Sequence, residues 1–282
     1  MKIIKKVAQL KKEIIKLKKA GKTIGFTPTM GALHNGHITL AKQMLKENDI
    51  GIVSVFVNPT QFNDASDLKK YPRTLKNDAA LLEKAKVDIL FAPSNVEVYP
   101  KGLSTKLKID LKGLDKRMEG KFRDGHFEGV CQVVKRLLDI TTPDTLYMGQ
   151  KDFQQFTIIG QMIADLKIPT RLVVCDIVRE KSGLAMSSRN ARLTKDLKKR
   201  ALIIHQTLLW IKKNKNRYSI ADLKKKALDK MTIPGFKPEY VSIVNGKDLK
   251  NIRKMTAHNY VVVCTAVWAG DVRLIDNMII KK

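Results

Sequence analysis

Two histidines stand three residues apart in the stretch TIGFTPTMGALHNGHITLAKQMLK, residues 23–46, of a chain that has only five. At this spacing His34 and His37 share one helical face, so both imidazoles can act on one group. A short apolar run leads into a turn rich in Pro and Gly, and a helical pattern begins near Ile38. Because a helix start presents unpaired N–H groups and partial positive charge, this unit predicts a phosphate site.

The better-known phosphate loops, GxxxxGK[ST] and GxGxxG after a strand, are absent from the sequence. A nucleotide bound here would therefore be held by histidines and backbone amides. A turn with a purely structural role is the alternative. A zinc site is disfavoured, because zinc needs three or four protein ligands and no third ligand has a recognisable spacing.

The longer stretch PTMGALHNGH resembles the HxGH signature of the nucleotidyltransferase superfamily, and in this form it is similar to the pantoate–β-alanine ligase family. The resemblance is specific from about residue 20 to about residue 195 and looser beyond. It implies ATP, pantoate and β-alanine as substrates, Mg²⁺ as cofactor and a homodimer. Within this loop it implies catalytic roles for His34 and His37 and ATP contacts from Met30, Gly31, His34, Gly36 and His37.

Two further stretches, NPTQF at residues 58–62 and GQKDFQQ at residues 149–155, match the same family. The resemblance implies that Gln61 and Gln155 bind pantoate, whose hydroxyls and carboxylate suit an amide that both donates and accepts. It implies that Gly149, Lys151 and Asp152 bind ATP, with Lys151 also catalytic. Without the resemblance, the two stretches are typical of an Asn-Pro turn and a helix cap.

The stretch MSSRN, residues 186–190, looks like the family's counterpart of the KMSKS loop. Hydroxyls and a guanidinium suit a pyrophosphate leaving group, since Arg forms bidentate bonds to phosphate oxygens. The resemblance implies a catalytic role for Arg189 and ATP contacts from Val178, Met186, Ser187, Ser188 and Arg189.

Two weaker matches concern acidic and imidazole side chains. Asp78 matches a carboxylate that the resemblance associates with magnesium, and a solvated helix charge is an alternative of nearly the same weight. The stretch GHFEGV, residues 125–130, also resembles the family, but no role follows for His126 or for the nearby Arg123.

Strands are expected at residues 24–26, 50–57, 87–91, 145–148 and 171–176, with helices of about a dozen residues between them. This alternation predicts an α/β fold with a Rossmann-like parallel sheet, whose ligands lie beyond the carboxyl ends of the strands. Beyond residue 190, helices at 193–213 and 220–231 precede strands at 240–244, 260–269 and 272–280, while residues 94–124 read as irregular. We therefore expect a nucleotide- and pantoate-binding domain over residues 1–176 and a smaller C-terminal α+β lid domain over residues 177–282.

The composition narrows the function classes. The chain has 282 residues and a net charge of +27. The excess Lys is scattered over most predicted helices without interleaved aromatics, so compositional bias is favoured over nucleic-acid binding. No apolar run reaches 18 residues, so no transmembrane helix is expected, and residues 1–22 read as an amphipathic surface helix instead of a signal peptide. Three widely spaced cysteines in apolar runs indicate free thiols in a reducing cytoplasm.

The leading hypothesis is an ATP-dependent acid–amine ligase that condenses pantoate with β-alanine through an acyl adenylate. A nucleotidyltransferase that leaves the nucleotide on its acceptor is the alternative enzyme. A nucleic-acid-binding protein is the alternative from another class, and the charge of +27 is its only support.

Overall fold

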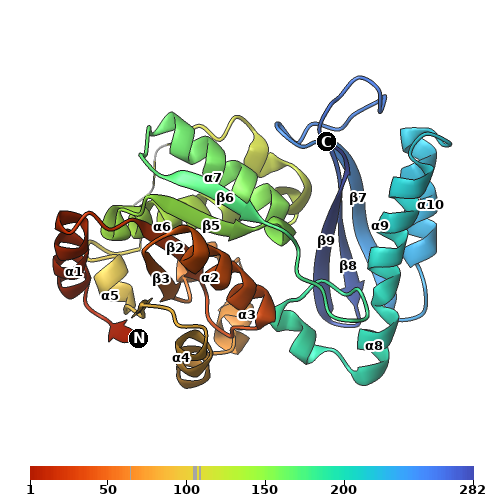
Figure 1. The fold of residues 1–282 in the computed structure, drawn as a ribbon. Coiled ribbons are helices and arrows are strands. Elements are labelled where there is room, and N and C mark those ends of the chain that lie inside the picture. Colours follow the sequence, from red (N-terminus) through yellow and green to blue (C-terminus); the bar gives the residue numbers. More distant parts are fainter. Residues whose placement is uncertain (64, 104–106, 108) are drawn as a thin grey trace. The chain divides into compact units, whose positions relative to one another are not determined.

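The computed structural model describes residues 1–63, 65–103, 107 and 109–282, which form two compact units (Figure 1). The first unit contains Met1–Asp115, Arg123–Gly149 and Ile158–Cys175. The second contains Lys116–Phe122, Gln150–Thr157 and Asp176–Lys282. Two segments that precede the expected boundary at residue 176, Lys116–Phe122 and Gln150–Thr157, thus group with the C-terminal residues.

The first unit is built on a six-stranded parallel sheet in the order β1-β4-β3-β2-β5-β6. Its strands are β1 (Lys2–Ile4), β2 (Ile24–Thr29), β3 (Ile50–Val55), β4 (Ile89–Phe91), β5 (Thr145–Gly149) and β6 (Arg171–Cys175). The predicted α/β class is confirmed. Strand β3 is buried along its centre, as expected for an apolar strand inside a parallel sheet.

The prediction of one N-terminal surface helix was wrong at its start. Residues Lys2–Ile4 form the edge strand β1, paired with β4, before α1 (Val7–Lys19) begins. Strand β1 has only three residues, of which only Ile4 is buried, so its sequence shows no alternation that would reveal a strand. Helix α1 is amphipathic as expected, with Leu10 and Ile14 buried.

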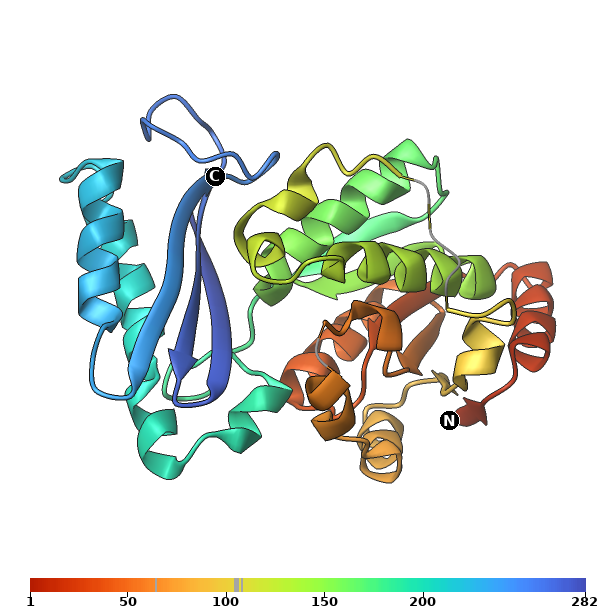
Figure 2. The ribbon, with the colours of Figure 1, turned by 180° about the vertical axis from the view of Figure 1, so that it is seen from behind.

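Helices cover both faces of the six-stranded sheet. Helix α2 (Asn35–Glu47) packs with α4 (Leu75–Lys84) on the face seen in Figure 1, and α6 (His126–Thr141) packs beside α1 on the face seen in Figure 2. Gly25 and Gly51 are neighbours across β2 and β3, and a Cβ on either would collide with Met44 of α2. These glycines let α2 approach the sheet closely. The remaining helices that reach this unit are α3 (Ala65–Lys70), α5 (Asn95–Val98) and α7 (Phe153–Asp165).

The strand order places the ligand crevice. From β2 the chain proceeds outward through β3 and β4, whereas β5 pairs with the other side of β2. The connections thus change direction between β2 and β5, and ligands of such sheets bind beyond the carboxyl ends of the strands at that point. The histidine loop follows β2, and Gly149 ends β5.

The second unit is an antiparallel sheet in the order β7-β8-β9, covered on one face by two helices. Its helices are α8 (Lys195–Arg200), α9 (Leu202–Asn214) and α10 (Ile220–Met231), and its strands are β7 (Phe236–Asn245), β8 (Val261–Ala269) and β9 (Val272–Lys281). The single helix expected over residues 193–213 is divided at Ala201. No helix within the described ranges is long and apolar enough to cross a membrane.

A partly buried ionic cluster explains why Lys116–Phe122 belongs to the second unit. The guanidinium of Arg273 on β9 binds the carboxylates of both Glu119 and Glu239. The Tyr240 hydroxyl donates to Glu119 at 2.7 Å, and the Glu119 amide donates to Gln154 at 3.0 Å.

Residues 94–124, which were expected to be irregular, contain α5 and two 3₁₀ turns in the part that the structure describes. Residues 104–106 and 108 lie outside the described residues.

Candidate active site

The histidine loop is shaped by residues with left-handed backbone. Gly31 and Ala32 have φ angles of 82° and 50° and turn the chain from β2 toward α2. Only glycine adopts this conformation without strain, so Ala32 needs compensating contacts. The buried Asp78 of α4 supplies them: its carboxylate accepts hydrogen bonds from the amides of Ala32 at 3.1 Å and Leu33 at 2.8 Å.

These contacts bear on the predicted metal-binding role of Asp78. Besides the two amides, the Thr74 hydroxyl lies within 3.3 Å of both carboxylate oxygens. The carboxylate is therefore occupied by protein donors. Across the described ranges, no group of three or more His, Cys, Asp or Glu side chains could hold a metal ion. In this structure Asp78 anchors the histidine loop, and its magnesium-binding role stays a prediction.

His34 and His37 cap the start of α2 with their ring nitrogens. His34 Nδ1 accepts from the Gly36 amide at 3.1 Å, and His37 Nδ1 accepts from the His34 amide at 3.3 Å. The two ring centroids lie 4.0 Å apart. A ring nitrogen that accepts carries no hydrogen, so each neutral imidazole has its N–H on Nε2. The loop therefore presents two adjacent imidazoles as hydrogen-bond donors at the positive end of a 13-residue helix.

The structure brings Gln61 next to this loop. Gln61 is buried in the 3₁₀ turn that follows β3, and its Nε2 lies 3.1 Å from the sulfur of Met30. Its Oε1 accepts from Asn58 at 3.2 Å. The buried ring of His126, for which the sequence indicated no role, contacts the Gln61 backbone oxygen at 2.7 Å. His126 thus supports the turn that carries Gln61.

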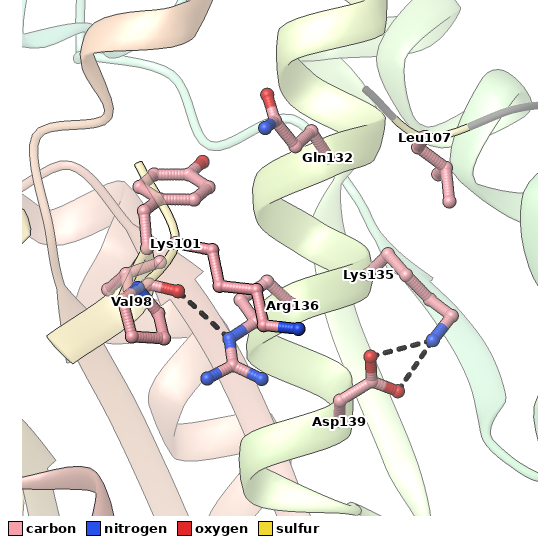
Figure 3. A pocket seen from close by; sticks show the side chains of 9 residues that line it. Val98, Lys101, Leu107, Gln132, Lys135, Arg136 and Asp139 are labelled. Carbon is pink, nitrogen blue, oxygen red and sulfur yellow. Dashed lines mark hydrogen bonds and ion pairs between the residues drawn. The ribbon is translucent and has the colours of Figure 1, made fainter. Parts of the chain in front are cut away.

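A cavity of about 430 Å³ lies beside this loop in the first unit. Met30, Gly31 and Asp78 line one side, and residues after β3 and β4 line the rest. A second cavity, of about 290 Å³, lies between α6 and the segment that follows α5 (Figure 3). Its lining includes Lys101, Gln132 and Arg136, and it contains none of the predicted site residues.

The other predicted residues lie in the second unit. Lys151 and Asp152 occupy a 3₁₀ turn before α7, with 3.7 Å between the Lys151 Nζ and an Asp152 oxygen, and Gln155 lies in the first turn of α7. The Met186 amide donates to the Val178 carbonyl at 3.0 Å, which closes a hairpin. Ser187 caps the 3₁₀ turn Ser188–Arg192 by accepting from the Arg189 amide at 3.3 Å.

The predicted site residues are thus divided between the two units. The first unit holds Met30, Gly31, His34, Gly36, His37, Gln61, Asp78 and Gly149.

Comparisons with known proteins cover the whole chain. The model of the family described as pantoate-beta-alanine ligase matches residues 2–279. The chain is 48% identical over 280 residues to a pantothenate synthetase of Azobacteroides pseudotrichonymphae, covering 99% of both chains. It is 45% identical over 283 residues to one of Bacteroides fragilis strain YCH46, covering 100% of both.

Solved structures agree with this match. A pantothenate synthetase from Thermus thermophilus has a TM-score of 0.93 and 35% identity, with 100% of both chains covered. A pantoate-beta-alanine ligase from Francisella tularensis, complexed with beta-gamma ATP and beta-alanine, has a TM-score of 0.82 and 38% identity, with 99% of this chain and 98% of that chain covered. The chain belongs to the pantoate–β-alanine ligase family.

Proposed function

We propose that the protein condenses (R)-pantoate with β-alanine in a reaction driven by ATP, giving pantothenate, AMP and pyrophosphate. The observation that carries this proposal is the family match over residues 2–279. The paired imidazoles at the start of α2 support it, because they fit a site for phosphate.

The reaction has two steps. A pantoate carboxylate oxygen attacks the α-phosphorus of ATP. The bond between that phosphorus and the oxygen bridging it to the β-phosphorus breaks, and pyrophosphate leaves. The amine of β-alanine then attacks the carbonyl of pantoyl adenylate, AMP leaves with the electrons of the broken C–O bond, and the nitrogen releases a proton to water. Adenylation is needed because a free carboxylate has no good leaving group.

The protein contributes positioning and charge stabilisation. The Nε2–H groups of His34 and His37 donate to phosphate oxygens, where negative charge is redistributed in the transition state. Lys151 and Arg189 balance the charge of the departing pyrophosphate. The amides of Gln61 and Gln155 bind pantoate.

Magnesium, the homodimer and the cytoplasmic location belong to the proposal as well. Among the described residues no group of three or more His, Cys, Asp or Glu side chains could hold a metal ion, and we expect Mg²⁺ to arrive bound to the phosphates of ATP. The three buried free cysteines fit a reducing compartment. Light scattering in solution would test the dimer, with a monomeric mass counting against it.

The deciding experiment is ATP–pyrophosphate exchange with pantoate alone, followed by AMP release on adding β-alanine. Exchange that requires pantoate, with AMP appearing only after the amine, is the expected result. Transfer of AMP to an acceptor that keeps it would favour a nucleotidyltransferase. No exchange with pantoate would contradict the proposed substrate.

Variants of His37 separate catalysis from helix capping. His37→Asn retains an acceptor where Nδ1 meets the His34 amide, but it removes the Nε2–H donor. If the donor matters, His37→Asn and His37→Ala both lower the exchange rate by about 10²–10³, the usual loss for one such donor. Recovery of the rate in His37→Asn would assign His37 a capping role only.

A further inference from the structure

A buried asparagine of the C-terminal sheet holds the turn that carries Lys151. Asn277 on β9 is 2% exposed. Its Nδ2 donates to the carbonyls of Gln150 at 2.9 Å and Lys151 at 2.8 Å, and its Oδ1 accepts from Gln150 Nε2 at 3.1 Å. The side-chain amide therefore commits both donor hydrogens and an acceptor to a single turn. All of these residues belong to the second unit.

The preceding residue holds the hairpin that leads to Arg189. Asp276 is 4% exposed, and its carboxylate accepts two bonds from Arg179, at 2.6 and 3.0 Å. Arg179 also donates to the Gly183 carbonyl at 3.1 Å and pairs with Ala185 in an isolated bridge. Arg179 thus fixes both arms of the hairpin over residues 178–186, immediately before Ser187.

The alternation of side chains along a strand makes this double attachment possible, because consecutive residues point to opposite faces. Asp276 shares its face with Leu274 and Ile280, which pack in the helix-covered core. Asn277 shares the other face with Arg273, which binds Glu119. One dipeptide can therefore fix two segments that are distant in sequence.

Fold stability alone gives no reason for these residue types. An apolar pair at these strand positions could pack without the desolvation that buried Asp and Asn undergo. The polar atoms are retained where they meet backbone carbonyls of the Lys151 turn and the guanidinium of the hairpin. We therefore attribute the choice of Asp and Asn at these positions to the Lys151 turn and the hairpin that they contact.

We propose that Asp276 and Asn277 are positioning residues for the groups that bind pyrophosphate. Asn277 sets the position of Lys151, and Asp276, through Arg179, sets the position of the hairpin before Arg189. The inference rests on the proposed function, which assigns Lys151 and Arg189 to the phosphates.

Double-mutant cycles test this assignment, since residues that act through one another have non-additive effects. The assays are ATP–pyrophosphate exchange and ATP binding by calorimetry. Asn277→Ala is expected to lower exchange by about 10–100-fold, as small misplacements of catalytic groups do. In a Lys151→Ala background the same change is expected to cost no more than about 2-fold. In an Arg189→Ala background its full effect should persist.

Arg179→Lys provides the second cycle, because it keeps a cation beside Asp276 but loses the bidentate geometry. Arg179→Lys should lower the exchange rate by a smaller factor in the Arg189→Ala background than in the wild-type protein. In the Lys151→Ala background it should lower the rate by its full factor. Ile280→Val shortens an apolar core side chain of the same strand that takes no part in the hydrogen bonds of Asp276 or Asn277, so it is the control for lost stability and should keep wild-type exchange. Asn277→Asp, which preserves shape, replaces Asn277→Ala if the latter does not fold.

The outcomes separate the two proposals. If Asn277 variants match Ile280→Val, or if their effect is undiminished without Lys151, the positioning role is wrong. If wild-type protein binds ATP but shows no pantoate-dependent exchange, the proposed function is wrong. In that case the double-mutant cycles can be repeated with the dissociation constant of ATP as the measured quantity. They would still decide whether Asn277 acts through Lys151.

Discussion

Replacing Asp78 with asparagine distinguishes a loop anchor from a metal ligand. In the structure both carboxylate oxygens are committed to the backbone amides of Ala32 and Leu33 and to the Thr74 hydroxyl. Asparagine has the same shape but offers one oxygen and one NH₂ group. One loop amide would then face a donor instead of an acceptor.

The size of the effect follows from the bond that is lost. A hydrogen bond to a charged group contributes about 1.5–3 kcal/mol, and leaving a buried N–H unpaired incurs a similar penalty. We therefore expect Asp78→Asn to lower the free energy of unfolding of the first unit by about 1.5–3 kcal/mol. Asp78→Ala removes both amide bonds and should cost about 3–6 kcal/mol, unless the loop opens locally.

The assay is thermal or urea unfolding of apo protein in EDTA, together with the Mg²⁺ dependence of pyrophosphate exchange. Glu83→Gln is the matched control, because it removes the same charge from an exposed position of α4. A loop anchor predicts lost stability in EDTA and an unchanged Mg²⁺ dependence. Unchanged stability in EDTA with a raised Mg²⁺ requirement would refute the anchoring role and restore the metal ligand.

Three further predictions concern separate parts of the molecule. Arg189→Ala should lower exchange by about 10²–10³ while far-ultraviolet circular dichroism and the melting temperature stay near those of wild type; near-normal turnover would contradict its role. Gly129→Ala should strongly destabilise the first unit in urea unfolding, because its Cβ would collide with the Thr60 carbonyl, and a normal midpoint would contradict this packing. Burial and nearby carboxylates raise the pKa of Cys131 to about 12, so a thiol reagent at pH 8 should label it only after denaturant is added; prompt labelling of the native protein would show that it is accessible.

Much of the first unit could be predicted from local patterns. The buried strand β3 is a continuous β-branched run, and the loops after β2, β3 and β5 carry recognisable motifs. Strand β1 was missed because a three-residue edge strand has no readable period. Strand β7 begins four residues earlier than predicted, at Phe236, since a register shift near Pro238 accommodates the proline within the strand.

Contacts between distant polar residues could not be predicted in this way. Glu119 and Arg273 are 154 positions apart, and Asn277 lies 126 positions from Lys151. Hydrophobic periodicity reports which face of an element is buried, but it does not identify the partner of a buried charge or amide. Likewise, the resemblance associates Asp78 with magnesium, but a carboxylate in the first turn of a helix gives no sign of the amides it will meet.

The hydrogen bonds of the histidine loop also decide how the site can hold phosphate. Its expected donors were histidines together with backbone amides. In the structure, however, five of those amides already donate within the protein, namely those of Gly31, Ala32, Leu33, His34 and Gly36. Two of these bonds end on imidazole Nδ1 atoms, which places the ring hydrogens on Nε2. The same contacts that occupy the loop amides therefore orient the imidazoles as donors, and we expect phosphate recognition at this loop to fall mainly to His34 and His37.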